Sequence, residues 1–89
     1  MPTILFIMGW RFFFYSNEAD EPIHVHFQKG EREGKLWLDV ENFELVEAHA
    51  FHLSPADKRT VRKIVFGNFE YIISQWQEMQ RERQSGKGA

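Results

Sequence analysis

The feature that most constrains the fold is the stretch EPIHVHF at residues 21–27, in which polar and apolar residues alternate. Successive side chains of a β-strand leave opposite faces of the sheet. The alternation therefore sends His24 and His26 to one face and the apolar residues around them to the other. Because an apolar sheet face must be buried, we expect a second layer of structure against it.

Four other segments have the composition of strands. Residues 4–8 are apolar, 10–15 are rich in aromatics, 35–40 alternate, and 43–51 predict a weaker strand. Gly9 predicts either a tight hairpin or a bulge in one bent strand.

Residues 29–34, KGEREG, are predicted to be a hairpin loop. In the strand that follows it, the alternation places Leu36, Leu38 and Val40 on the core face.

Residues 54–83 are predicted to be helical. Ser54 is a good N-cap, Pro55 suits the first helical position, and Asp57 favours the positive end of a helix. Gly67-Asn68 predicts a break, with Gly ending one helix and Asn capping the next. One stripe at spacings of three and four faces the sheet: Val61, Ile64, Val65, Asn68, Ile72, Trp76 and Met79.

These patterns predict one α+β domain over residues 1–83, with strands at about 3–51, helices at about 54–83 and a flexible tail at 84–89. The fold is an antiparallel sheet of four or five strands with the C-terminal helices packed on one face. The predicted core is Ile23, Val25, Phe27, Leu36, Leu38, Val61, Ile64, Val65, Ile72 and Trp76.

Composition agrees with a compact domain, since 43% of the 89 residues are apolar and 16% are aromatic. The chain has no cysteine, which excludes disulfides and zinc-thiolate sites. The apolar start is too short for a membrane span and lacks the features of a signal peptide, so we expect a cytoplasmic protein. Residues 16–50 hold nine acids against three bases, whereas 51–89 hold seven bases against four acids. This asymmetry suits contacts with a partner.

The order of motifs resembles a small bacterial family known as domain of unknown function 4160. The matching pieces are the N-terminal MPT, RFFFYSNE at 11–18, EPIHVH at 21–26, KG at 29–30, KLWL at 35–38, and Asn68 followed by Trp76. The family commonly has Gly-Phe just before the first helix, where this chain has His52-Leu53. Members are often encoded beside another small domain in arrangements read as toxin–antitoxin pairs, so the resemblance implies a partner and no activity.

His24 and His26 lie two residues apart on one strand and can share a divalent metal ion. A functional metal site needs a third ligand, and composition leaves five candidates: Glu18, Glu21, Asp39, His49 and His52. The alternative is a structural pair that stacks on Trp37 or Tyr15 and hydrogen-bonds across the sheet.

The same face is predicted to carry further aromatic and basic side chains. The candidate ligand-binding residues are Arg11, Tyr15, His24, His26, Lys35 and Trp37. Such a surface suits a small anionic ligand or a nucleotide base. It suits an oligomer interface better, because aromatic residues and Arg are enriched at interfaces.

The first predicted helix carries a basic stripe, and its members are Lys58, Arg59, Arg62 and Lys63. A nucleic-acid-binding protein would place such a stripe on phosphates, although amphipathicity alone also explains it. No phosphate loop, nucleophile elbow or HExxH motif is present.

We therefore expect an interaction or regulatory domain that works with itself or a small protein partner. The alternatives are a small nuclease or metal-assisted hydrolase centred on His24 and His26, and a nucleic-acid-binding regulator that uses the basic helix.

Overall fold

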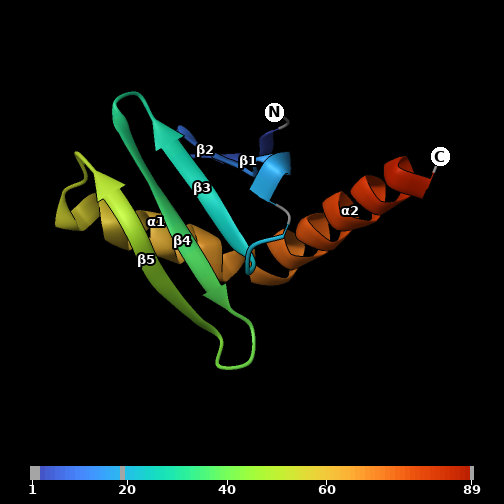
Figure 1. Ribbon diagram of the computed structural model, residues 1–89. Coiled ribbons are helices and arrows are strands. Elements are labelled where there is room, and N and C mark those ends of the chain that lie inside the picture. Colours follow the sequence, from blue (N-terminus) through green and yellow to red (C-terminus); the bar gives the residue numbers. More distant parts are fainter. Residues whose placement is uncertain (1–2, 19, 89) are drawn as a thin grey trace.

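The computed structural model describes residues 3–18 and 20–88. It contains a five-stranded sheet followed by two helices (Figure 1), which confirms the predicted α+β fold. The elements are β1 (Thr3–Ile7), β2 (Trp10–Phe13), the short 3₁₀ helix η1 (Ser16–Glu18), β3 (His24–Lys29), β4 (Arg32–Asp39), β5 (Glu44–Phe51), α1 (Pro55–Gly67) and α2 (Phe69–Gly88). The strands lie side by side in sequence order, and each neighbouring pair is antiparallel.

Two tight turns build the first and third hairpins. Met8 and Gly9 both have positive φ, at 56° and 83°, as a two-residue type I′ turn requires. Gly30 has a φ of 62° and opens the turn between β3 and β4, where Lys29 pairs with Arg32. The predicted loop at 29–34 is therefore too long, because β4 begins before Gly34 and pairs with β3 from Arg32 to Trp37.

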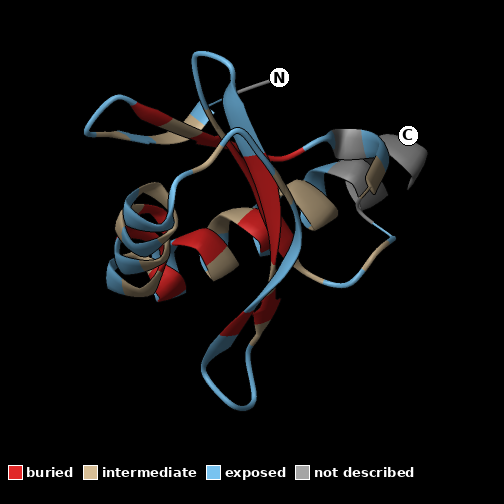
Figure 2. Ribbon diagram, turned by 90° about the vertical axis from the view of Figure 1, so that its left-hand side faces the viewer, coloured by how far each residue is buried: buried red, intermediate tan, exposed pale blue. Residues whose placement is uncertain are grey.

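The apolar face of the sheet packs against the helices (Figure 2). Every predicted core residue is buried except Ile23, which is partly buried and packs against the core. Trp10, Phe12 and Phe14 join the core from β2 and the residue after it. The assignment of Val40 to the core face is wrong. It lies in the turn after β4 and is 49% exposed, because the strand ends at Asp39, whose carboxylate accepts hydrogen bonds from Asn42.

Local signals place the helix ends. The Ser54 hydroxyl accepts a hydrogen bond from the Asp57 backbone N–H, and the Asp57 carboxylate accepts one from the Ser54 N–H, which completes a capping box. The predicted break occurs at Gly67-Asn68. The Asn68 side chain, however, donates to the Ile64 carbonyl, so it closes α1 instead of capping α2.

Helix α2 runs to Gly88, beyond the predicted end at residue 83, and it extends away from the sheet (Figure 1). The flexibility of the segment at 84–89 stays a prediction. Met1 and Pro2 of the N-terminal motif and Ala89 of the predicted tail lie outside the described residues. Over the described part of the chain, neither helix combines the length and the apolar character that crossing a membrane requires.

Candidate functional site

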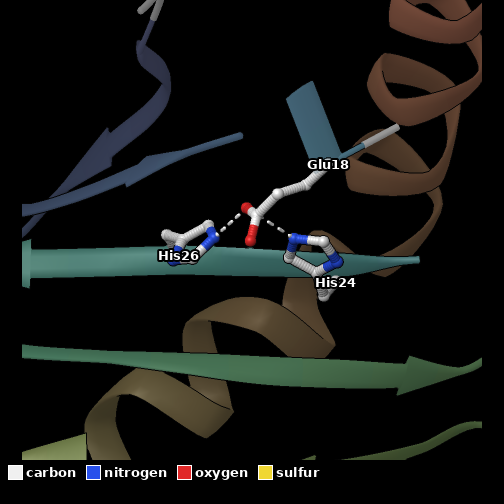
Figure 3. Close-up of side chains that lie close together, drawn as sticks. All are labelled: Glu18, His24 and His26. Carbon is white, nitrogen blue, oxygen red and sulfur yellow. Dashed lines mark hydrogen bonds and ion pairs between the residues drawn. The ribbon is translucent and has the colours of Figure 1, made fainter. Parts of the chain in front are cut away.

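Glu18, which comes from η1, converges with His24 and His26 on one face of β3 (Figure 3). The Oε1 atom of Glu18 lies 3.1 Å from His24 Nε2 and 2.7 Å from His26 Nε2. One potential ligand atom from each of the three residues lies within 4.8 Å of the other two. Among the five candidates that composition left open, Glu18 is thus the residue that joins the predicted histidine pair.

Two elements bring these side chains together. β3 presents both imidazoles on one face, as the alternation predicts. After β2, the chain turns through η1, where the Glu18 N–H donates to the Tyr15 carbonyl and the Glu21 N–H donates to the Glu18 carbonyl. These bonds fold the segment back over β3 and aim the Glu18 carboxylate at the imidazoles.

Aromatic rings hold both imidazoles in place. The ring of His26 stacks on Phe13 at 5.6 Å and meets the edge of Tyr15 at 4.5 Å. His24 packs edgewise against Trp37 at 5.2 Å and Trp76 at 5.0 Å. The contacts with Trp37 and Tyr15 match the structural interpretation of the pair. Sequence reasoning missed Phe13 and Trp76 as parts of the site, and the contact of Trp76 with a strand residue so far away in the chain left no local signal.

The cluster is nearly closed to solvent. His24 is 0% exposed and His26 is 8% exposed, while the side chain of Glu18 retains 20%. Burial raises the pKa of Glu18, but its contacts with His26 and His24 outweigh burial and hold that pKa below the usual value. Burial also lowers the pKa of His26, in spite of its contact with Glu18. The carboxylate is therefore the charged partner, beside an imidazole whose neutral form burial favours.

A buried lysine borders the cluster. Lys35, opposite His26 on β4, donates to Glu21 Oε1 at 3.0 Å and lies 3.7 Å from Glu18 Oε2. Its ammonium group also lies 4.2 Å from the centre of the Trp37 ring. Lys35 thus links Glu18 and Glu21 to the sheet, and both come from the segment between β2 and β3 that covers the cluster (the covering segment).

The other predicted ligand residues lie elsewhere. Arg11 lies on β2, which β3 separates from β4. It donates to the Thr3 hydroxyl on β1 and packs over the Phe13 ring. Asp39 accepts hydrogen bonds in the turn after β4. His49 is exposed and packs against Phe51, and His52 is exposed with a φ of 63°. Among the described residues, Asp39, His49 and His52 therefore do not belong to the histidine cluster.

Two residues of the predicted basic stripe on α1 contact β5, and the other two are exposed to solvent. Lys58 forms an ion pair with Glu47 at 3.2 Å, and Arg62 donates to the Leu45 carbonyl, so both face β5. Arg59 and Lys63 are exposed. A nucleic-acid interface on α1 stays a prediction, and salt-dependent binding that is lost in Arg59→Ala/Lys63→Ala would support it.

A second surface lies on the same face of the sheet, beyond the histidine cluster. Cross-strand pairing places Val46 beside Trp37, His49 beside Lys35, and Phe51 beside Glu33. We call Trp37, Val46, His49 and Phe51 the β5 surface. Val46 is 53% exposed and Phe51 is 51% exposed, and Leu45 is the one β5 residue in the described core.

A family model described as "Domain of unknown function (DUF4160)" matches residues 9–77 of the chain. The match includes η1, the histidine strand and Trp76. Comparisons with curated proteins and with solved structures returned no match.

Proposed function

This chain belongs to the family of domain of unknown function 4160, and we propose that it is a small interaction domain that pairs with a second copy of itself through β5. The observation that carries this proposal is the pair of exposed apolar side chains on the terminal strand of the sheet, Val46 and Phe51. Exposed apolar side chains on a long edge strand are typical of a binding surface.

The two edge strands of the sheet differ in how far they are blocked from pairing with another chain. The β1 edge is short, its register is interrupted between Thr3 and Leu5, and the Tyr71 hydroxyl donates to the Ile4 carbonyl. The β5 edge is longer and spans Glu44–Phe51. Its register with β4 also shifts, between Lys35 and Leu36, and α1 contacts it through the Arg62 hydrogen bond to the Leu45 carbonyl and the Lys58–Glu47 ion pair. β5 contains neither Lys nor Pro, the residues that most often block edge pairing.

A second copy suits the charge pattern of this strand. Antiparallel pairing of two β5 strands about their midpoint would set Val46 opposite His49 and Glu44 opposite Phe51. No two acids then face each other directly, so this pairing avoids the repulsion between like charges on opposed strands. Such a contact is isologous and closes as a dimer.

Light scattering coupled to size exclusion tests this pairing on the full chain. The wild type should elute as a dimer of the 10.6 kDa chain. Val46→Lys should give the monomer, because it replaces an apolar side chain of the contact with a charged one, and lysine on an edge strand opposes edge pairing. The matched control is Phe6→Lys on β1, where Phe6 is 67% exposed, and it should stay dimeric.

A monomeric wild type at about 0.5 mM, or a dimer unchanged by Val46→Lys, would overturn the proposal. A wild type that stays monomeric alone and forms a complex only with another small protein would also overturn self-pairing. That result would favour the toxin–antitoxin-like pair that the family resemblance implies.

The second candidate function is a small nuclease or metal-assisted hydrolase centred on His24 and His26. The specific observation in its favour is the approach of Glu18 to both imidazoles. Lys35 could neutralise an anionic substrate group beside them. Cleavage of phosphodiester substrates that persists in His26→Ala and Glu18→Gln would exclude this activity.

A further inference from the structure

The hydrogen bonds of His24 determine where its protons lie. Its Nδ1 atom is 2.9 Å from the Pro22 carbonyl oxygen, which can only accept. Nδ1 therefore carries a proton, and in the neutral ring Nε2 is left with a lone pair. That lone pair points at Glu18 Oε1 from 3.1 Å. Two lone pairs at this distance repel each other unless a proton or a metal ion lies between them.

His26 aims its Nε2 atom at the same oxygen, from 2.7 Å. A proton can satisfy this contact, because the neutral Nε2–H form of His26 donates to a carboxylate. One divalent cation placed among the three ligand atoms would accept lone pairs from both imidazoles and from the carboxylate, and so would remove the repulsion at His24.

The surroundings of the cluster resemble the outer shell of a metal site. A metal-bound histidine commonly donates its other ring nitrogen to a backbone carbonyl, as His24 does to Pro22. The second carboxylate oxygen of Glu18 lies 3.7 Å from Lys35 Nζ, so that oxygen is also oriented. Phe13, Trp37 and Trp76 fix the planes of the imidazoles.

The spacing of the ligand atoms suits an ion of the zinc class. Two ligands on a tetrahedral ion with bonds of about 2.0–2.1 Å lie roughly 3.3 Å apart. The separations of 3.1 Å and 2.7 Å are slightly shorter, and the exposed side of the Glu18 chain leaves it room to withdraw. Two imidazoles and one carboxylate favour Zn²⁺ and its transition-metal neighbours over Ca²⁺ or Mg²⁺.

We propose that Glu18, His24 and His26 bind one zinc-class divalent ion, which fastens η1 and the segment that follows it to β3. Glu18 is the only one of the three that comes from the covering segment. The ion therefore joins η1 to β3 through side chains that come from separate elements. Because the ligands are nearly buried, the site is structural in character, and its role is independent of the pairing of β5.

Zinc titration of the full chain, first stripped with a chelator, tests the site. Isothermal calorimetry should show one Zn²⁺ per chain, and bound Co²⁺ should show the visible bands of a low-symmetry nitrogen and oxygen site. Glu18→Gln keeps the size of the side chain and removes the anionic ligand. It should weaken Zn²⁺ binding by more than about 100-fold, since losing an outer-shell partner alone costs about 10–100-fold.

The matched control is His49→Gln/His52→Gln, which removes the two exposed imidazoles outside the cluster and should bind Zn²⁺ as the wild type does. Zn²⁺ should also slow hydrogen exchange over residues 14–23 in the wild type and not in Glu18→Gln. Because His24 is fully buried, His24→Ala/His26→Ala can lose binding by unfolding, so Glu18→Gln decides. Failure of the wild type to bind one ion, binding that survives Glu18→Gln, or binding lost in the His49/His52 control would each overturn the proposal.

Discussion

Replacing Gly34 by alanine should destabilise the protein strongly. Gly34 lies inside β4, opposite Phe27 on β3 and Ala50 on β5. A Cβ atom at this position would lie 2.4 Å from Phe27 Cζ and 2.7 Å from the His49 carbonyl oxygen. Ordinary contacts between carbon atoms are about 3.5–4.0 Å, so the Phe27 ring would have to move by about 1 Å.

Neither contact can relax at low cost. Phe27 is 2% exposed and packs against Trp10 and Phe12, and the His49 oxygen belongs to the backbone of the paired strand. Overpacking of this kind typically costs about 1–3 kcal/mol. Alanine recovers roughly 0.5–1 kcal/mol by restricting the unfolded chain. The clash outweighs this gain, because two contacts are violated at once. We expect a net loss of about 2 kcal/mol, or a fall of about 8–16 °C in Tm.

Thermal and urea unfolding followed by circular dichroism measure this loss. The matched control is Gly67→Ala at the end of α1, where a Cβ atom would meet nothing within 4 Å. This variant should be more stable than the wild type by about 0.5 kcal/mol. If Gly34→Ala unfolded at or above the wild-type temperature, β3, β4 and β5 could not approach one another as described.

Three further predictions concern the start of α1. His52 has a φ of 63°, a left-handed conformation that costs a residue with a Cβ atom about 1–2 kcal/mol. His52→Gly should therefore raise the free energy of unfolding, measured in urea, by about 0.5–1 kcal/mol. A lower free energy of unfolding would contradict the strain at this position. Ser54→Ala should lower stability by about 1 kcal/mol through loss of the cap while Ser54→Thr keeps most of it, and equal losses would argue against the capping role. Hydrogen bonds from the Ser54 backbone lead the contacts that lower the pKa of Asp57, so its contribution is present above the free value of about 3.9 and is lost as pH falls through the lower folded value. The stability difference between wild type and Asp57→Asn should therefore be constant from about pH 7 to pH 5 and shrink below about pH 4, and a difference that grew on acidification would contradict this sign.

Short-range patterns determined the elements and their faces. The alternation at residues 21–27 placed His24 and His26 on one face, and the Ser54-Pro55 and Gly67-Asn68 pairs marked the helix ends. These signals work because side-chain direction and capping depend on neighbours within a few residues. They failed at Gly34, where pairing with β3 extended the strand, and at Val40, where the turn closed by Asp39 and Asn42 ended it.

The histidine cluster shows where local information ended. Sequence alone left five candidates for a third residue beside His24 and His26, and the chain between each candidate and the histidines could form a loop that brings them together. The free energy of closing a loop changes slowly with its length, so sequence distance could not choose among them. The turn at η1 and the burial of β3 under that segment selected Glu18.

The same division applies to the surfaces. The composition of α1 predicted a basic stripe, but packing against β5 engaged Lys58 and Arg62 and left Arg59 and Lys63 exposed. The apolar character of residues 43–51 was visible in the sequence, whereas the position of β5 at the sheet edge came from the strand order. The sequence by itself determined which side chains share a strand face or a helix stripe, because local backbone geometry governs both. Only the tertiary structure decided which of those side chains meet and which face solvent, because contacts between distant segments depend on the packing of the whole chain.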